Sequence, residues 1–416
     1  MTKLTQAHGN WVAGEDRFWD REHEIDLFIQ SLDEGANLHI VAQRRIGKTS
    51  LMREVSRRIE DRYICLHVDL QTAQTAEDLI VELSVATHPH KSLWHKTREV
   101  FSNIFGQAVG SIESLEIDEV TVKIRDGLLG GNWQAKGNRL LAALATSEKP
   151  IVIFMDEVPI LVNRMLKGAD YQMTPERVEA TDQFMSWLRK NSLAHQGKIC
   201  FVVTGSIGFE PILRQARLSA TINHFEPFEI EPWDAETAMG CLQALANNYG
   251  VTFEEGAPER VTERLNSCIP HHVQMFFSHI YKMSKKRGDM VCRVEDVDEV
   301  YEKYMLSSKG HAELSTFEER LKMMVGDAML PFILDLLTEA ALAGRLSAKA
   351  LDFYRTEHDL DGSEGRDKTR EVIDILEHDG YLRQRPEGYV FVSFLLRDWW
   401  KRRFGFGFSI ASEREG

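Results

Sequence analysis

The tripeptide Gly47-Lys48-Thr49 carries residue types that could bind phosphate. It follows a short apolar stretch at 38–41 that predicts a strand. It opens a segment whose apolar residues recur every four positions up to Ile59, as in a helix. In this context the backbone amides of the loop and of the helix N-terminus would face phosphate oxygens. Lys48 would add a positive charge at the terminal phosphates, and the Thr49 hydroxyl would hold Mg2+.

The start of this loop departs from the phosphate-loop pattern Gly-x4-Gly-Lys-Thr, because Ala42 stands at its first position. If residue 42 has a positive φ, its Cβ costs about 1–2 kcal/mol. If the residue only ends the strand, alanine is harmless. The alternative interpretation is a chance Gly-Lys-Thr sequence in an ordinary strand-to-helix turn, and the flanking strand and helix argue against it.

Two adjacent carboxylates, Asp156 and Glu157, follow an entirely apolar run at 150–155. A run of this kind is typical of a central parallel strand that is buried on both faces. Asp156, at the carboxyl end of the strand, would hold the Mg2+ shell, and Glu157 would polarise an attacking water as general base. The alternative is a strand that ends in a solvated acidic turn.

A third apolar run, at 199–203, ends at Thr204, and Ser206 follows two residues later. Either hydroxyl could contact a γ-phosphate or the attacking water, and either could equally cap the next turn. Arg214 and Arg217 come after this strand. One of them could face the nucleotide of a neighbouring subunit and stabilise charge in the transition state, whereas the alternative is that both are surface charges.

Composition limits the class of protein. The chain has 416 residues, of which 43% are hydrophobic and 27% charged, so we expect a globular protein of two or three domains. The N-terminus lacks an apolar signal core, no stretch approaches the roughly 20 apolar residues of a membrane span, and five scattered cysteines suit a reducing compartment. We therefore expect a cytoplasmic protein without membrane contact. The formal net charge of −14 argues against a surface built for general nucleic-acid binding, although a local basic patch is compatible with it.

The order of the expected elements indicates an α/β core followed by helices. Alternation of Val120, Val122 and Ile124 with polar residues predicts a strand or hairpin there, and the polar stretch at 162–175 predicts a mobile loop. Pro232 marks a boundary, after which four helices are expected up to Met305. The five strands of the core are expected at 38–41, 63–70, 150–155, 198–204 and 225–230.

The C-terminal part, 330–405, predicts helix, helix, helix, hairpin and helix, which is the order of a winged helix. Its third helix would read DNA, but Lys368 and Arg370 are mixed there with acidic residues that repel phosphates. The most basic stretch follows the tryptophans at 399 and 400, which we expect to pack in the domain. The expected domains are residues 1–231, 232–310 and 311–416. The basic stretch after the two tryptophans consists of Lys401, Arg402 and Arg403.

Several of these motifs together resemble the archaeal-type ATPases, prokaryotic P-loop proteins that lie between the AAA+ and STAND groups. The loop from Gln43 to Leu51 resembles the Arg-Arg-x-Gly-Lys-Thr-Ser-Leu loop of that family. The Arg21-Glu22 pair, the Asp156-Glu157 pair, the Thr204-Gly205-Ser206 strand end and Pro270 are also similar to its motifs. So is the ending from Tyr389-Val390-Phe391 to Arg397-Asp398-Trp399. Two departures are Ala42 and Cys268, where the family usually has glycine.

The resemblance implies a P-loop NTPase fold of the AAA+ and STAND type. This is a parallel five-stranded sheet in the order 5-1-4-3-2, followed by a helical lid and a C-terminal winged-helix domain. It implies ATP and Mg2+ as cofactors. We expect nucleotide contacts from Gln43, Arg44, Arg45, Ile46, Gly47, Lys48, Thr49, Ser50, Arg21 and Pro270. We expect catalytic roles for Glu157, Lys48, Thr204, Arg214 and Arg217, and metal contacts from Thr49 and Asp156.

Three functions are compatible with these residues. The leading hypothesis is an ATP-hydrolysing conformational switch that controls a protein or nucleic-acid partner, with oligomerisation left open. The first alternative is a DNA-associated, initiator-like or regulatory ATPase that binds DNA through the winged helix. The second is a scaffold that holds a nucleotide without hydrolysing it, and the presence of Glu157 counts against that alternative.

Overall fold

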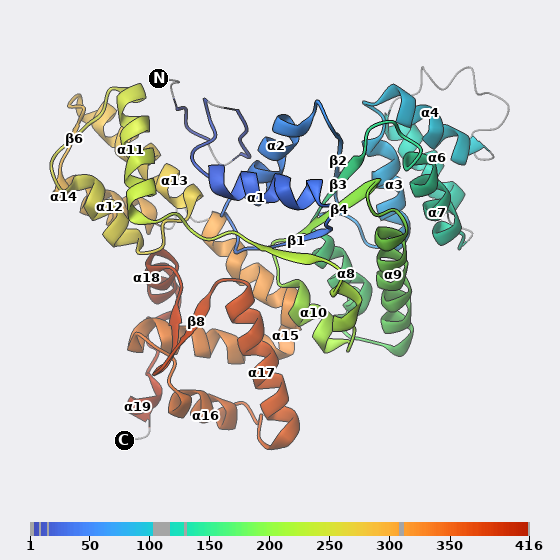
Figure 1. The fold of residues 1–416 in the computed structure, drawn as a ribbon. Helices are drawn as coiled ribbons and strands as arrows, with labels where there is room; N and C mark the ends of the chain where they lie inside the picture. The colour runs from blue at the N-terminus through green and yellow to red at the C-terminus, as the bar shows by residue number, and fades with distance from the viewer. Residues whose placement is uncertain are drawn as a thin grey trace. The chain divides into compact units, whose positions relative to one another are not determined.

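The chain folds into two compact units. The computed structural model describes residues 4–7, 10–14, 16–102, 117–128, 131–307 and 312–414. The first unit, called the sheet unit here, contains residues 21–41 and 51–230. The second, called the helical unit, contains residues 1–20, 42–50 and 231–416. Figure 1 shows the elements of both. Within the described ranges, no helix is long and apolar enough to cross a membrane.

The sheet unit is built on five parallel strands in the order β2-β3-β4-β1-β5. This order confirms the one that the resemblance implied. Strands β3 and β4 lie inside the sheet, and their side chains are buried from end to end except at Asp156. The strands are β1 (Leu38–Val41), β2 (Ile64–Asp69), β3 (Ile151–Asp156), β4 (Ile199–Thr204) and β5 (Glu226–Glu229).

Helices cover this sheet through apolar residues spaced three or four positions apart. In α1 (Glu22–Asp33), the ring of Phe28 packs against Phe154 of β3 and Phe228 of β5, at centroid distances of 6.3 and 5.0 Å. The other helices of the unit are α2 (Lys48–Ile59, from Leu51 on), α3 (Ala76–Ala86), α4 (Lys91–Val100), α6 (Ile117–Leu128), α7 (Trp133–Leu144), α8 (Val158–Lys167), α9 (Pro175–Ala194), α10 (Phe209–Gln215) and η2 (Ser219–Ile222).

Two expectations for the sheet unit are wrong. The alternation at 120–124 predicts a strand, but these residues lie in helix α6, where Ile124 and Leu128 are fully buried and Val122 is exposed. Burial every four residues shows that the helical period governs this segment. The stretch at 162–175 predicts a loop, but its first six residues belong to α8, whose Val162 and Leu166 are fully buried.

The helical unit contains two successive sets of elements. Residues 232–310, called the lid here, form α11 (Ala235–Tyr249), β6 (Thr252–Phe253), α12 (Ala257–Leu265), α13 (Pro270–Arg287), β7 (Val291–Cys292), α14 (Val294–Val300) and η3 (Tyr301–Met305). Residues 312–414, called the C-terminal domain, form α15 (Ala312–Ala343), α16 (Ala348–Glu357), α17 (Gly362–His378), β8 (Leu382–Arg385), β9 (Gly388–Phe391), α18 (Phe394–Phe404) and α19 (Ala411–Arg414). The second set follows the order expected for a winged helix. Helix α15 is kinked at Gly326.

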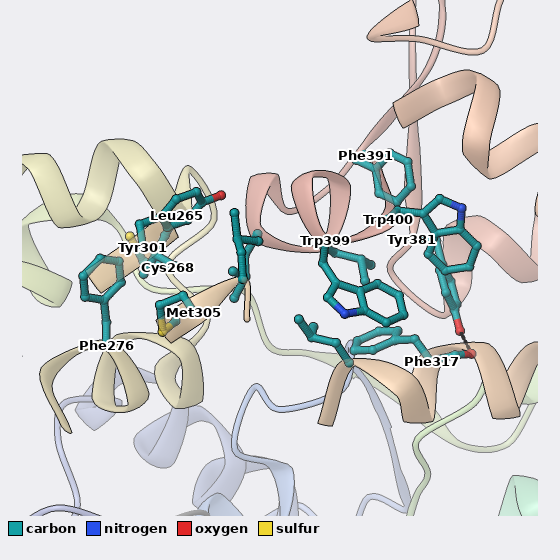
Figure 2. Close-up of a cluster of buried hydrophobic side chains, with 14 of the residues drawn as sticks. Leu265, Cys268, Phe276, Tyr301, Met305, Phe317, Tyr381, Phe391, Trp399 and Trp400 are labelled. Carbon is teal, nitrogen blue, oxygen red and sulfur yellow. Dashed lines mark hydrogen bonds between the residues drawn. The ribbon is translucent and has the colours of Figure 1, made fainter. Parts of the chain in front are cut away.

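One buried hydrophobic cluster runs through the lid and the C-terminal domain (Figure 2). Trp399 and Trp400 belong to it and are 3% and 0% exposed, so they pack inside the domain as expected. The Tyr301 hydroxyl of the lid donates to Asp398 Oδ2 at 2.8 Å, and Trp400 Nε1 donates to Thr338 Oγ1 at 3.2 Å. The two sets of elements therefore share a core.

Candidate functional site

The loop from Ala42 to Gly47 joins β1 to α2 and belongs to the helical unit. Gly47 has a φ of 103° and Arg45 a φ of 67°, whereas Ala42 is not among the described residues with positive φ. Alanine at position 42 therefore carries no left-handed strain, and the departure from the glycine pattern is harmless. A Cβ built on Gly47 would have no atom within 4 Å, so the backbone there is open to close approach.

Lys48, the first residue of α2, turns its side chain back over this loop. Its ammonium group donates to the carbonyl oxygens of Ala42 and Gln43 at 2.9 and 3.0 Å, and the residue is 8% exposed. Thr49 and Ser50 follow in the first turn of the helix, and Ser50 Oγ accepts a hydrogen bond from the Val12 amide at 3.0 Å. Ile46 is buried and anchors the loop. The phosphate-type loop is thus well formed, with its lysine held at the loop's centre.

Gln43 and Arg44 of the loop contact the C-terminal domain inside the helical unit. The Arg44 guanidinium donates to Thr316 Oγ1 and lies 6.0 Å from the centre of the Phe317 ring. A Cβ built on Gly380, which has a φ of 76°, would lie 2.9 Å from both Cβ and Oε1 of Gln43. These contacts join residues more than 250 positions apart, so no local sequence signal could have predicted them.

Tyr381 connects the two segments of the C-terminal domain that contact the loop. Its hydroxyl donates to the carbonyl oxygen of Phe317 at 2.6 Å, which holds the turn after α17 against the start of α15. Burial of this tyrosine raises its pKa well above the ordinary value, and Asp379 raises it further. The hydroxyl therefore stays protonated and keeps donating.

The second group of predicted residues lies at the carboxyl edge of the sheet. Asp156 ends β3, and its Oδ1 accepts a hydrogen bond from the Glu157 amide at 3.1 Å. It is in register with Asp69 at the end of β2, a second carboxylate at this edge that the sequence analysis missed although it also follows an apolar strand. Burial lowers the pKa of the Arg53 guanidinium, and attraction to Asp156 opposes that change. Asp156 thus lies near a cation of the same unit.

Glu157 and Ser206 contact each other directly. The Ser206 amide and hydroxyl both donate to Glu157 Oε2, at 2.9 and 2.6 Å. Glu157 itself has a φ of 63°, an uncommon conformation for a side-chain-bearing residue. Nearby, Thr204 ends β4 with 0% exposure, and its buried hydroxyl has no hydrogen-bond partner within the described part of the chain. The edge therefore combines a fixed carboxylate with a buried hydroxyl.

The remaining predicted residues lie elsewhere. Arg214, on α10, and Arg217, after it, are both exposed on the segment between β4 and β5. Arg21 is 7% exposed at the start of α1, where it pairs with Glu24. Pro270 is the first residue of α13 in the lid. The functional roles of these four residues stay predictions.

Three strands of the sheet unit end at one edge of the sheet. In a parallel sheet the carboxyl ends of all strands lie at one edge, and ligands bind outside that edge. Strand β4 lies between β1 and β3, so Val41, Thr204 and Asp156 end at the same edge. The loop continues directly from Val41.

The residues present fit a nucleotide phosphate with Mg2+. Open loop backbone at Gly47, the helix N-terminus and Lys48 are the donors that phosphate oxygens require. Thr49 of the helical unit has a hydroxyl and Asp156 of the sheet unit has a carboxylate, and each is a type of ligand that Mg2+ takes together with substrate phosphates and water. Among the described residues no cluster of three or more histidine, cysteine, aspartate or glutamate side chains could hold a metal by itself.

Comparisons with known proteins identify the fold. No protein-family model and no curated protein matches the chain. Among solved structures, the Walker-type ATPase PABY2304 of Pyrococcus abyssi is 15% identical with a TM-score of 0.59, over 94% of this chain and 98% of that one. The ORC2 protein of Aeropyrum pernix is 12% identical with a TM-score of 0.53, over 95% and 97% of the two chains. The chain therefore has the fold of the archaeal-type AAA+ P-loop NTPases, as its sequence motifs implied.

Proposed function

We propose that this protein binds ATP with Mg2+, hydrolyses it, and uses the nucleotide to switch the state of its C-terminal domain. The observation that carries this proposal is the contact of the phosphate loop itself, through Gln43 and Arg44, with the C-terminal domain. The nucleotide part is supported by the fold and by the Aeropyrum pernix ORC2 protein, which was solved as ADPNP–ADP complexes. An unidentified protein partner would bind one of the two states of the C-terminal domain. Oligomerisation of the chain would be compatible with this function.

The chemistry assigned to each residue follows from its type. Loop amides and Lys48 would hold the phosphates, while Thr49 and Asp156 would hold Mg2+. Bound Mg2+ would neutralise negative charge on the phosphate oxygens. Glu157 would act as general base toward water, and the buried Thr204 hydroxyl would donate toward the γ-phosphate.

The proposed switch depends on competition between loop carbonyl oxygens and phosphate oxygens for the Lys48 ammonium group. Lys48 donates to the carbonyl oxygens of Ala42 and Gln43, and phosphate oxygens would compete for its ammonium group. A change in the backbone at Gln43 would be passed to Gly380, because these two residues are in close contact. A ligand shifts an equilibrium only as far as it favours one state over the other. The γ-phosphate would therefore set the position of the C-terminal domain through residues 43 and 44.

Lys48→Ala and Glu157→Gln test the nucleotide chemistry. We expect Lys48→Ala to lose both ATP affinity and turnover, since its cation serves binding and catalysis. We expect Glu157→Gln to keep ATP affinity and to lose turnover by roughly 10²–10⁴-fold, the usual contribution of a general base. Phosphate release and fluorescent-nucleotide binding measure the two effects, and the exposed Lys190→Ala is the control. Equal turnover in all variants would contradict the assignment, and bound ADP without turnover would favour the scaffold alternative.

A DNA-associated ATPase is the second candidate, and strand β8 of the C-terminal domain favours it. Arg383 and Arg385 are both exposed and lie two residues apart on β8, so they share one face of the hairpin. Partial burial of its guanidinium and the charge of the neighbouring Arg385 lower the pKa of Arg383, and a bound phosphate would offset the repulsion between the two arginines. The basic stretch at 401–403 supports DNA binding less, because Arg402 pairs with Glu302 and Arg403 with Glu318.

A further inference from the structure

The two oxygens of the Glu157 carboxylate are not equivalent. Oε2 accepts two hydrogen bonds, from the amide and from the hydroxyl of Ser206, at 2.9 and 2.6 Å. Oε1 accepts none from the described residues. A carboxylate in water rotates between equivalent orientations, so this arrangement fixes which oxygen is bonded to Ser206 and which is not. The orientation of the carboxylate is fixed by one residue, Ser206, which lies 49 positions away in the sequence.

The backbone around this pair is shaped to bring it together. A Cβ built on Gly205 would lie 2.6 Å from the Cδ and Cγ atoms of Pro159, closer than any side chain allows. Only glycine therefore lets the end of β4 approach the start of α8. Glu157, at the N-cap of α8, has φ 63° and ψ 29°, a conformation that costs of order 1–3 kcal/mol for a non-glycine residue. Such strain persists where the surroundings over-determine it, which fits a site that must hold one geometry.

We propose that Ser206 is a positioning residue that orients Glu157 as general base; this inference rests on the proposed ATPase function. Ser206 holds Oε2, and Oε1 takes a proton from the attacking water. The water oxygen bonds to the γ-phosphorus as its O–H bond breaks. The bond from that phosphorus to the bridging oxygen breaks, and its electron pair leaves with ADP. The proton on Oε1 then passes to phosphate or solvent, which restores the carboxylate.

Hydrogen-bond counting separates this role from that of a phosphate sensor. A serine hydroxyl has one proton to donate, and a backbone amide also has one. Both donors of Ser206 are used by Glu157, so neither is left for a phosphate oxygen. Thr204, whose hydroxyl is buried and without a hydrogen-bond partner in the described residues, is the side chain suited to that second role.

The test compares Ser206→Ala and Ser206→Thr with Glu157→Gln in the full-length protein. Ser206→Ala removes the hydroxyl bond but keeps the amide bond, so we expect kcat to fall by about 10-fold, with KM and the affinities for ATP and ADP within about twofold of wild type. Ser206→Thr keeps a hydroxyl and should restore most of the rate. Ser192→Ala is the matched control, since this buried hydroxyl donates only to a helix carbonyl, that of Arg189.

The double variant decides whether Ser206 acts through Glu157. If it does, adding Ser206→Ala to Glu157→Gln lowers the residual rate no further and leaves ATP affinity unchanged. A phosphate sensor would instead lose affinity for ATP relative to ADP in both backgrounds, and that result would overturn the proposal. Normal turnover in Ser206→Ala, together with abolished turnover in Glu157→Gln, would contradict the positioning role of Ser206 but leave the proposed ATPase function standing. Absence of turnover in the wild type contradicts the proposed function and this inference together.

Discussion

At the scale of single residues, the phosphate loop shows how backbone conformation decides which departure from a motif matters. Ala42 occupies the position of a usual glycine, yet the left-handed residues of the loop are Arg45 and Gly47. The residue that the motif makes look anomalous is unstrained, and the strain falls on Arg45, whose place in the motif gives no sign of a left-handed backbone. Sequence patterns record residue types, whereas the free energy depends on φ at each position.

The candidate site residues could be predicted where the residues concerned are close together in the sequence. Lys48 and Thr49 follow a strand, and Asp156 and Glu157 end another, so each pair is visible within a stretch of about ten residues. The bond between Ser206 and Glu157 was not predictable, because its geometry depends on two strands meeting and on Gly205 fitting against Pro159. Asp69 was missed for the same reason, since its pairing with Asp156 is a matter of register.

His67 gives a prediction about pH at this scale. It lies on β2 with its ring stacked on Phe154 at a centroid distance of 4.9 Å and with Nε2 2.9 Å from Ser56 Oγ. Burial, together with the charge of Arg53, lowers its pKa from the ordinary 6.5 to about 4. Between these pH values the unfolded chain binds more protons than the folded chain, so stability rises with pH. His67 should therefore remove up to about 3 kcal/mol of unfolding free energy as the pH falls from 6.5 to 4.

Urea unfolding between pH 7.5 and 4.5 measures this effect. His67→Gln can keep a bond to Ser56 but cannot take up the proton, so its unfolding free energy should depend less on pH in that window. His95→Gln is the control, because that side chain is 71% exposed. Equal pH dependence in wild type and His67→Gln would contradict the prediction.

At the scale of elements, the sequence predicted the sheet well and two helices badly. Continuous apolar runs in β3 and β4 leave little ambiguity, because a strand buried on both faces has no polar positions. In α6, residues 120, 122 and 124 match a period of two, but positions four apart also lie on one helix face, and only the burial of Leu128 decides between them. Short amphipathic segments are therefore where sequence reasoning fails.

The contact between the phosphate loop and the C-terminal domain leads to a prediction about α15. Thr316→Val removes the hydroxyl that accepts from Arg44 without changing the phosphate loop. We expect faster amide hydrogen exchange at 316–325 in the nucleotide-free variant, by about 5-fold if one hydrogen bond of about 1 kcal/mol is lost. We expect ATP to cause a smaller further change there than in wild type, because part of the contact is already lost.

Hydrogen exchange followed by mass spectrometry, with and without ATP, measures both effects. Thr356→Val is a matched control, since the Thr356 hydroxyl is exposed and bonds only to Asp361. An ATP response at 316–325 as large in Thr316→Val as in wild type would show that this contact does not transmit the state of the loop.

At the scale of the whole molecule, the lid and the C-terminal domain are energetically connected. Their buried side chains form one cluster (Figure 2). The Tyr301 hydroxyl of the lid donates to Asp398 Oδ2 of the C-terminal domain at 2.8 Å. Separating them would expose Trp399 and Met305, which are nearly fully buried. A switch that acts on the C-terminal domain is therefore expected to move the lid with it, and a mobile winged helix alone is disfavoured.

Charge at this scale bears on DNA binding. The chain carries a formal net charge of −14, so general attraction to a polyanion is unfavourable. The basic residues of α17 are balanced by acids on the same helix, as Lys368 pairs with Glu364 and Arg370 with Asp367. Any affinity for duplex DNA should then depend on the exposed pair Arg383 and Arg385 on β8.

Fluorescence anisotropy with a labelled duplex tests this prediction. If those two arginines neutralise two phosphates, raising the salt from 50 to 200 mM should weaken binding by about 12-fold, because the logarithmic slope is about −0.9 per phosphate. Replacing Arg383 and Arg385 with alanine should abolish binding. Replacing Arg402 and Arg403 should leave it unchanged, since these residues pair with Glu302 and Glu318. DNA binding that survives replacement of Arg383 and Arg385 but is lost on replacement of Arg402 and Arg403 would contradict binding through β8. Absence of binding at 50 mM salt would exclude the DNA alternative.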